Sequence, residues 1–442
     1  MTRWGLLTGW GRTAATGMTV LSGRDDAALS EAVRNAGARG ILARGLGRSY
    51  GDAACNAGGA VVDMTGRDRI LGWDLAEGTV RVEAGVSLRR LVDAALQRGW
   101  FLPVLPGTGY VTAGGAIAAD VHGKNHPAVG SLARHVSSVD LLTADAVVRT
   151  VGPADTPEVF HATCGGMGLT GLILRATLRL APAPSAWLVT ETERAPDLDG
   201  LIARLADGRG YPYAAAWLDL LARGGTTGRG VVVRGRHAAR GEAPVGPAPA
   251  RRRPGVPAVV PGGTLNRVSV RAFNEAWFRR APRRRARALA SVPAFFHPLD
   301  AVPHWNRLYG PRGFVQYQAA LPFGAEPALR RLVDRVAACG HAPFLGVLKV
   351  LGAEAGGPLS FPMPGWTLAL DLAATPEIVT LLDRLDELVA AAGGRVYLAK
   401  DARLRPDLLA AMYPRVDAFR ETREQMDPRR VFMSNLARRL SL

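Results

Sequence analysis

Lysine is scarce in this 442-residue sequence: only three of its 55 basic residues are lysine, and the other 52 are arginine. Because lysine is normally among the commonest residues, the three that remain are candidates for work that arginine cannot do. Such work needs a compact point charge or an amine that can lose its proton near neutral pH. Lys124 and Lys400 have polar, chemically capable neighbours, whereas Lys349 is a lone charge in an apolar run, where an ion pair within a sheet explains it equally well. We therefore predict functional roles for Lys124 and Lys400.

Cysteine and long apolar runs are scarce as well. The three cysteines are far apart, so they form neither a disulfide framework nor a metal-binding motif, and a reducing compartment fits them best. No apolar run approaches the ~20 residues of a membrane-spanning helix, and residues 1–23 lack the apolar core of a secretory signal. We expect no metal, and a cytoplasmic protein or one attached peripherally at the inner membrane.

Acidic side chains are rare in one segment. Residues 221–290 hold sixteen arginines, no lysine and two acids, which accounts for +14 of the net charge of +17. Within this segment, residues 241–263 are rich in Pro, Gly and Ala and predict a mobile loop. Residues 273–287 combine arginine with aromatics, a composition that suits an anionic membrane surface or, equally, a solvated face. No nucleic-acid-binding motif accompanies the charge, so we expect no nucleic-acid partner.

The order of predicted elements indicates an α+β protein. In the first ~180 residues, short strands alternate with Gly-rich turns, and Ser87 is placed to cap a helix that extends to Leu96. From about residue 185, strands and helices alternate, which suggests a second sheet covered by helices. The tail from residue 407 is predicted to be helical, with breaks near Pro414 and Pro428.

Three clusters of glycine with Ser, Thr and Asn lie before residue 172, in residues 44–52, 106–120 and 165–171. Glycines let backbone N–H groups approach a ligand closely, and successive N–H groups can form a cradle for phosphate. Any one cluster alone is best explained as turn chemistry. In the first cluster the spacing Gly45-x-Gly47-x-x-x-Gly51 is not G-x-G-x-x-G, and the sequence has no P-loop motif. Together, the three clusters resemble the FAD-binding fold of the vanillyl-alcohol oxidase/p-cresol methylhydroxylase (PCMH) superfamily.

Longer motifs make the resemblance more specific. The chain resembles the decaprenylphosphoryl-β-D-ribose 2′-oxidase family, the flavoprotein half of a 2′-epimerase, almost from end to end. The most specific stretches are Leu7–Thr13, Ala43–Asp52, Val104–Thr108, Gly114–His126, Cys164–Gly171, Phe296–Asp300, Trp305–Arg307, Gly313–Gln318, Ser360–Trp366, Tyr397–Asp401 and Met412–Asp417. The resemblance implies a PCMH-type FAD-binding domain over residues 1–184 and a C-terminal segment, 395–442, that returns to it. Between them, residues 185–394 would form a substrate domain with an antiparallel sheet, helices over it, and a mobile basic segment at about 221–290.

The resemblance also implies roles for individual residues. FAD would be bound by Arg44, Gly45, Gly47, Arg48, Ser49, Tyr50, Gly51, Asp52, Gly107, Thr108, Gly114, Gly115 and Ala116, with His122, Gly123, Asn125, Gly168, Thr170 and Ile173 lining the flavin. Arg48 stands where many members of the superfamily carry a histidine that links FAD covalently, so we expect non-covalent FAD. Lys400 would be the base beside the flavin, assisted by Tyr397. The substrate would be contacted by Lys124, Trp217, Gln316, Gln318 and Lys349.

Three positions depart from the family pattern near the substrate mouth. Phe296 replaces a tyrosine, Thr367 replaces an asparagine, and Ala369 stands where the mycobacterial enzymes carry a cysteine. The missing thiol should abolish covalent capture by inhibitors directed at that position. The departures leave the flavin chemistry intact, but they leave open a different sugar substrate.

The family reaction is oxidation of the 2′-hydroxyl of a polyprenylphosphoryl ribose, the first half of epimerisation to the arabinose form used for cell-wall arabinan. The resemblance implies that Lys400 accepts the hydroxyl proton while a hydride passes to FAD, and that Lys124 can hold a phosphate. A separate NADH-dependent reductase would then use the 2′-keto lipid. Two alternatives remain open: an FAD-dependent oxidase or dehydrogenase of a soluble sugar, alditol or nucleoside, and a non-catalytic protein that binds anions or membranes through residues 221–290.

Overall fold

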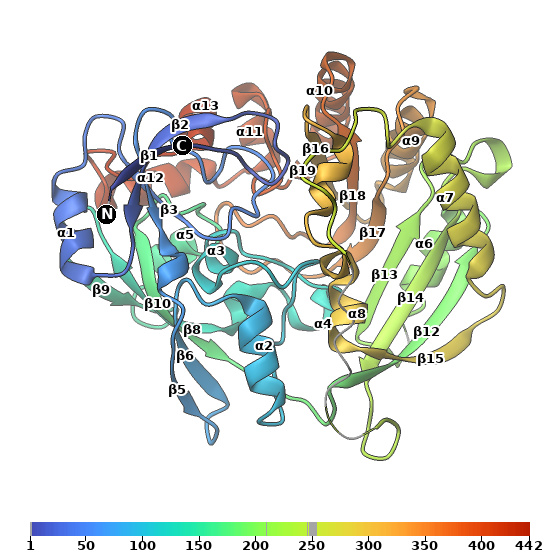
Figure 1. Ribbon diagram of the computed structural model, residues 1–442, viewed down its shortest axis with the longest axis horizontal. Helices are drawn as coiled ribbons and strands as arrows, with labels where there is room; N and C mark the ends of the chain where they lie inside the picture. The colour runs from blue at the N-terminus through green and yellow to red at the C-terminus, as the bar shows by residue number, and fades with distance from the viewer. Residues whose placement is uncertain (1, 209, 245, 247–253) are drawn as a thin grey trace.

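The computed structural model describes residues 2–208, 210–244, 246 and 254–442 (Figure 1). Two sheets form the first part of the molecule. One has four strands in the order β1 (Arg3–Leu7), β2 (Thr16–Ser22), β4 (Ala60–Asp63) and β3 (Ile41–Arg44), with only the β1–β2 pair antiparallel. The other is antiparallel, in the order β5 (Ile70–Asp74), β6 (Thr79–Glu83), β10 (Leu172–Arg179), β8 (Val136–Leu142) and β9 (Val148–Val151).

Short helices cover these two sheets and connect their strands. The predicted helix is α2 (Leu88–Leu96): the Ser87 side chain accepts a hydrogen bond from the Arg90 N–H, and the apolar face of the helix is buried. The other helices of this part are α1 (Asp26–Arg34), α3 (Ala113–Ala118), α4 (His126–Val129) and α5 (Pro157–Thr163). The short strands β7 (Trp100–Phe101) and β11 (Ala181–Pro182) pair beside them.

An eight-stranded antiparallel sheet dominates the second part. Its order is β15 (Ala286–Ser291), β12 (Trp187–Ala195), β14 (Gly230–His237), β13 (Tyr213–Leu218), β17 (Gly346–Leu351), β18 (Gly365–Ala373), β16 (Phe314–Pro322) and β19 (Arg395–Val396). Helices α6 (Leu198–Ala206), α9 (Glu326–Ala338) and α10 (Pro376–Ala391) pack on this sheet. The prediction of an α+β fold with a sheet covered by helices is confirmed.

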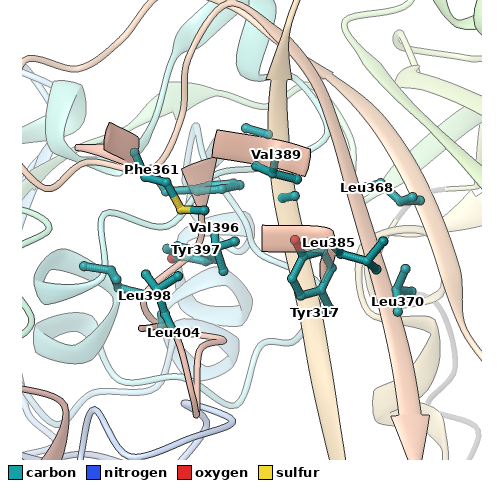
Figure 2. Packing of buried hydrophobic residues seen from close by; sticks show 14 of the residues in the cluster. Tyr317, Phe361, Leu368, Leu370, Leu385, Val389, Val396, Tyr397, Leu398 and Leu404 are labelled. Atoms are coloured by element: carbon teal, nitrogen blue, oxygen red, sulfur yellow. The ribbon is translucent and has the colours of Figure 1, made fainter. Parts of the chain in front are cut away.

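The two faces of this sheet have different chemistry, and the strand register sets which residue lies on which face. Tyr317, Leu368 and Leu370 pack against Leu385 and Val389 of α10 (Figure 2). Alternate residues of a strand point to opposite faces, so their neighbours in sequence point away from α10. These neighbours are the pairs Gln316–Asp371, Gln318–Ala369 and Lys349–Thr367. One face of β16, β17 and β18 is therefore polar and available to a site.

The chain end packs onto the first part. Helices α11 (Pro406–Met412), α12 (Val416–Met426) and α13 (Asn435–Leu440) follow the last strand, and Figure 1 places the C-terminus beside β1 and β2. Phe432 forms an isolated bridge with Ile41. Arg439 on α13 donates to Asp52 (2.9 Å) and to Asp401 (2.8 Å). These contacts tie residues 401 and 439 to the first glycine cluster.

The basic segment differs from its prediction. Residues 221–290, predicted to be mobile, contain strand β14, helix α7 (Arg267–Arg280) and most of β15. Strand β14 pairs with β12 and β13 on its two sides, and its Arg234 is buried against Glu191 and Glu193. The high arginine content concealed these elements, because an arginine buried in an ion pair cannot be told from a solvated one in sequence. The predicted run Arg251–Arg253 lies outside the described residues.

Candidate active site

A cavity of about 280 Å³ lies between the first part and the polar face of the eight-stranded sheet. Its walls come from segments far apart in the sequence. Of the predicted site residues, those that line it are Gly45, Gly47, Arg48, Ser49, Tyr50, Gly107, Thr108, Gly114, Gly115, His122, Gly168, Ile173, Gln316, Gln318, Lys349, Ala369, Tyr397 and Lys400. All three glycine clusters thus meet in one cavity with two of the three lysines.

The glycine walls are shaped by close backbone approach. A Cβ on Gly45 would collide with the Thr112 hydroxyl, which caps α3 by accepting a hydrogen bond from Gly115 N–H (3.2 Å). Gly47 and Gly168 have φ values of +64° and +77°, in the left-handed region that favours glycine. A Cβ on Gly107, by contrast, would have no protein atom within 4 Å. Its missing side chain leaves free space in the cavity wall, as a bound group requires.

An acidic residue holds the second glycine loop in place. Asp300 accepts a hydrogen bond from the Thr108 hydroxyl (2.6 Å) and another from Gly109 N–H (2.8 Å). The Arg48 guanidinium lies over the Trp10 ring, 3.8 Å from its centroid, and burial lowers the pKa of Arg48. The buried Nε of Arg48 has no hydrogen-bond partner among the described residues. A buried donor of this kind fits a bound group that supplies acceptors.

Lys400 and Asp371 form the titratable centre of the site. The Lys400 ammonium nitrogen lies 3.8 Å from the centroid of the Tyr50 ring. Burial lowers the pKa of Lys400 to about 7, while Asp371 acts in the opposite direction. Burial raises the pKa of Asp371 to about 7, and its carboxylate accepts a hydrogen bond from the Gln316 amide (2.6 Å). Burial also lowers the pKa of Lys349 to about 8.

His122 is held as a neutral imidazole. The Gln318 amide nitrogen lies 2.9 Å from His122 Nε2 and 3.2 Å from the Thr367 hydroxyl, so it can donate to both. Burial is the main cause that lowers the pKa of His122, and the neighbouring Lys349 adds to it. With Nε2 accepting, the ring proton lies on Nδ1. In the part of the chain that the structure describes, this buried Nδ1 has no partner, which fits an acceptor on a bound ring.

Tyr397 is fixed by its surroundings. Its hydroxyl donates to the Ala119 carbonyl (2.7 Å), and its ring stacks on Phe361 with 4.6 Å between centroids. Burial raises the pKa of Tyr397 well above its usual range. The hydroxyl proton is therefore retained and already engaged, which suits a residue that shapes the wall next to Lys400.

Several predicted cofactor residues lie outside the cavity wall. They are Arg44, Gly51, Asp52, Ala116, Gly123, Asn125 and Thr170. Their contacts support the loops: Arg44 donates to the carbonyls of Thr8 and Ala54, both at 2.7 Å, and the Asn125 amide donates to the Pro103 carbonyl (2.9 Å). A Cβ on Gly51 would collide with the Asp401 carbonyl, so the first cluster abuts the Lys400 turn.

Four predicted substrate residues also lie behind the wall: Lys124, Trp217, Phe296 and Thr367. Lys124 donates to the Phe295 carbonyl and lies 4.5 Å from the centroid of the Phe295 ring, and burial lowers its pKa to about 7. Phe296 packs in an aromatic cluster around Tyr213, 4.9 Å between centroids. Trp217 pairs in register with Val347, which lines the cavity, so it lies one strand further out on the same face.

The structure adds residues that the motifs did not predict as site residues. Trp10, Thr112, Leu299, Asp300, Trp305, Leu345 and Val347 also line the cavity, and Asp371 adjoins it through Gln316. The signal for Asp371 was present in the sequence, because it follows Ala369 by two residues in a predicted strand and therefore shares its face.

Comparisons with known proteins agree with this geometry. The family model for an FAD binding domain matches residues 19–152, and the family model for D-arabinono-1,4-lactone oxidase matches residues 373–440. The chain is 41% identical over 451 residues to the decaprenylphosphoryl-β-D-ribose oxidase of Mycolicibacterium smegmatis, covering 99% of this chain and 97% of that protein. The chain belongs to the decaprenylphosphoryl-β-D-ribose oxidase family. Like that family, it is an FAD-dependent oxidoreductase.

Other relatives align with smaller parts of the chain. An uncharacterized protein in the mprA 5′ region of Streptomyces coelicolor is 47% identical over 372 residues, 81% of this chain and all of that protein. The L-gulonolactone oxidase of Bos taurus is 35% identical over 140 residues, 31% of each chain. In this member of the decaprenylphosphoryl-β-D-ribose oxidase family, the three glycine clusters line one cavity, and the unpartnered nitrogens of His122 and Arg48 fit a bound group that supplies hydrogen-bond acceptors.

Proposed function

We propose that this protein oxidises the 2′-hydroxyl of a polyprenylphosphoryl ribose to the 2′-keto sugar, the first half of epimerisation to the arabinose form. The observation that carries the proposal is an amine with lowered pKa, Lys400, in the wall of a glycine-lined cavity. The decaprenylphosphoryl-β-D-ribose oxidase of Mycolicibacterium smegmatis, whose name gives this substrate, aligns with 99% of the chain.

Lys400 is suited to accept the proton of the substrate hydroxyl. With a pKa of about 7, a large fraction of its side chain is the neutral amine near neutral pH, and a general base works best when its pKa lies near the working pH. Asp371 and the Tyr50 ring face stabilise the ammonium that forms when the proton arrives. Bound FAD supplies the acceptor for the hydride that leaves the same carbon.

The sheet face can position the sugar. Gln316, Gln318 and Lys349 line the cavity from β16 and β17, and amide and ammonium groups are suited to hydrogen-bond sugar hydroxyls. The Gln316 and Gln318 side chains are themselves held by Asp371 and Thr367, so their orientation is fixed before substrate binds. Lys124 lies behind this wall as a candidate contact for the substrate phosphate.

The 2′-keto product needs a reductant, which we assign to a separate NADH-dependent reductase. Gly166, Gly168 and Gly171 have the G-x-G-x-x-G spacing, but they lead into strand β10 instead of joining a strand to a helix, and no P-loop motif occurs. The sequence therefore offers no second dinucleotide fingerprint. None of the helices in the described residues is long and apolar enough to cross a membrane. Access to a polyprenyl lipid therefore calls for contact at a membrane surface.

Anaerobic mixing of the purified protein with candidate substrates tests the proposal, with the spectrum of oxidised flavin as readout. We expect bleaching with a polyprenylphosphoryl ribose and none with free ribose, alditols or nucleosides. Bleaching by the soluble compounds but not by the lipid-linked sugar would assign the protein to another alcohol. A colourless preparation that takes up no added FAD would contradict the flavoprotein assignment itself.

A further inference from the structure

Helix α7 carries two partly exposed aromatic rings at the margin of its buried face. Phe273 and Trp277 are each 45% exposed, lie one helical turn apart and stack with 6.2 Å between ring centroids. Figure 1 shows α7 at the periphery of the molecule. Contiguous exposed apolar groups, unlike singly scattered ones, mark interaction surfaces.

The buried face of α7 lies beside these rings. Val270 and Asn274 are buried, and the Asn274 amide donates to Asp219 after β13 (2.7 Å). Phe278, one turn further, packs under the Arg229 guanidinium, 4.6 Å from its ring centroid. Positions 273 and 277 follow positions 270 and 274 by three residues, so the two rings flank the buried face and remain partly exposed at its margin.

Packing contacts connect the rings of α7 to the cavity wall. Phe273 lies 5.4 Å from Phe344, centroid to centroid, and Phe344 packs against the buried aromatic cluster of Trp305, Tyr309 and Phe314. Trp305 lines the cavity, as does Leu345, the residue after Phe344. A series of packed apolar side chains, buried at Trp305, Tyr309 and Phe314, therefore connects the cavity wall to the rings of α7.

Positive charge surrounds this surface. Glu275, the one acidic residue of α7, is already paired with Arg229 and Arg279. Within the ranges that the structure describes, no carboxylate pairs with the exposed arginines that follow or flank the rings: Arg271, Arg280, Arg283 and Arg284. Unpaired arginines beside exposed aromatics match the headgroup region of an anionic bilayer, where rings enter the interface and each cation adds attraction.

We propose that the exposed rings of α7, with Arg271, Arg280, Arg283 and Arg284, dock the protein on an anionic lipid surface. This inference rests on the proposed function in one respect: Phe273 packs on Phe344, next to Leu345 of the cavity wall, so docking through α7 would bring the cavity close to a prenyl substrate held in the bilayer. The docking itself depends only on the rings and charges of α7.

The test measures binding of the FAD-loaded full chain to vesicles of phosphatidylcholine with phosphatidylglycerol, and to vesicles of phosphatidylcholine alone. The variant is Phe273→Ala/Trp277→Ala, and the matched control is Trp4→Ala/Phe323→Ala, which removes two exposed rings elsewhere. We expect the α7 variant to lose about tenfold or more in binding to anionic vesicles, and the control to bind as the wild type does. An unchanged α7 variant, or equal binding to both lipids, would overturn the proposal.

A second variant, Arg280→Gln/Arg283→Gln/Arg284→Gln, separates the charges from the rings. It should weaken anionic-vesicle binding, and the wild-type affinity should fall as salt rises. Flavin reduction by a short-chain, water-soluble prenylphosphoryl ribose should be equal in all variants, whereas reduction by vesicle-embedded long-chain substrate should slow in the α7 variants only. If no substrate reduces the flavin but vesicle binding still depends on α7, the docking surface stands and the proposed substrate fails.

Discussion

The Lys400 ammonium nitrogen lies over the face of the Tyr50 ring, 3.8 Å from its centroid. The two residues come from opposite ends of the chain, and the backbone joins them: Tyr50 N–H donates to the Ala399 carbonyl (3.1 Å). The ring face favours the charged amine, while burial favours the neutral one and lowers the pKa to about 7. A small change at this position therefore shifts the balance between base and conjugate acid.

The pH dependence of flavin reduction reports on this balance. Only neutral Lys400 can accept a proton, so the rate should rise with pH through an inflection near 7. Asp371 raises the pKa of Lys400, so Asp371→Asn should move the inflection to lower pH by about one unit. The measurement is the anaerobic reduction rate against pH in both proteins. A rate that becomes low and independent of pH in Asp371→Asn would instead identify Asp371 as the base.

Two glycine substitutions should separate loop packing from cofactor contact. Gly45→Ala places a methyl group against Thr112, so it should destabilise even the FAD-free protein, by about 1–3 kcal/mol. Gly107→Ala meets no protein atom, so FAD-free protein should melt as the wild type does, while FAD retention falls. Thermal melts with and without FAD, together with bound-flavin absorbance, provide the comparison. Full FAD retention in Gly107→Ala would remove the second cluster from the cofactor site.

Arg439 links the C-terminal helix to the first glycine cluster. Arg439→Met would leave Asp401, only 5% exposed, and Asp52 without their shared cation, so we expect a loss of about 2–3 kcal/mol in unfolding free energy. Arg405→Met is the matched control, because Arg405 also pairs with two carboxylates, Asp407 and Glu387, but in an exposed position. Its loss should be about 0–1 kcal/mol. Urea unfolding of FAD-free proteins measures both, and equal losses would contradict the role assigned to Arg439.

Tyr397→Phe asks whether the hydroxyl takes part in proton transfer. Because the hydroxyl already donates to Ala119, we expect a stability loss of about 1 kcal/mol and an unchanged pH inflection for flavin reduction. Stability and the pH profile are both measured on the FAD-loaded protein. A shifted inflection with unchanged stability would show that Tyr397 assists Lys400 directly.

Local sequence patterns predicted many of the helices and strands. The features that were missed depend on contacts between residues far apart in the sequence. Ser87 is a cap that can be read from its neighbours in the sequence, and the helix begins there. Alternation within its own strand places Asp371 on the same face as Ala369, but its register with Gln316 on β16 depends on strand pairing, which the local sequence does not reveal. The Thr108 hydroxyl donates to Asp300 across 192 positions of sequence, and the local sequence does not reveal this contact either. Helix α7 was not predicted, because its arginines obscure the buried positions Val270 and Asn274.

Two of the three lysines that the composition singled out lie in the cavity wall. Lys400 and Lys349 line the cavity, whereas Lys124 lies behind it against Phe295. Context in the sequence had favoured Lys124 over Lys349, since the apolar neighbours of Lys349 resembled a core strand. Those neighbours do belong to a strand, β17, and the alternation of its side chains directs Lys349 to the polar face.

The most direct test of Lys400 as the base is single-turnover reduction of Lys400→Arg by a polyprenylphosphoryl ribose without oxygen. Arginine keeps the positive charge but does not lose its proton. We predict that this variant binds FAD as the wild type does and that its flavin is reduced about 10²–10⁴-fold more slowly. Reduction at the wild-type rate, with full FAD content, would contradict the assignment of Lys400 as the group that takes the proton.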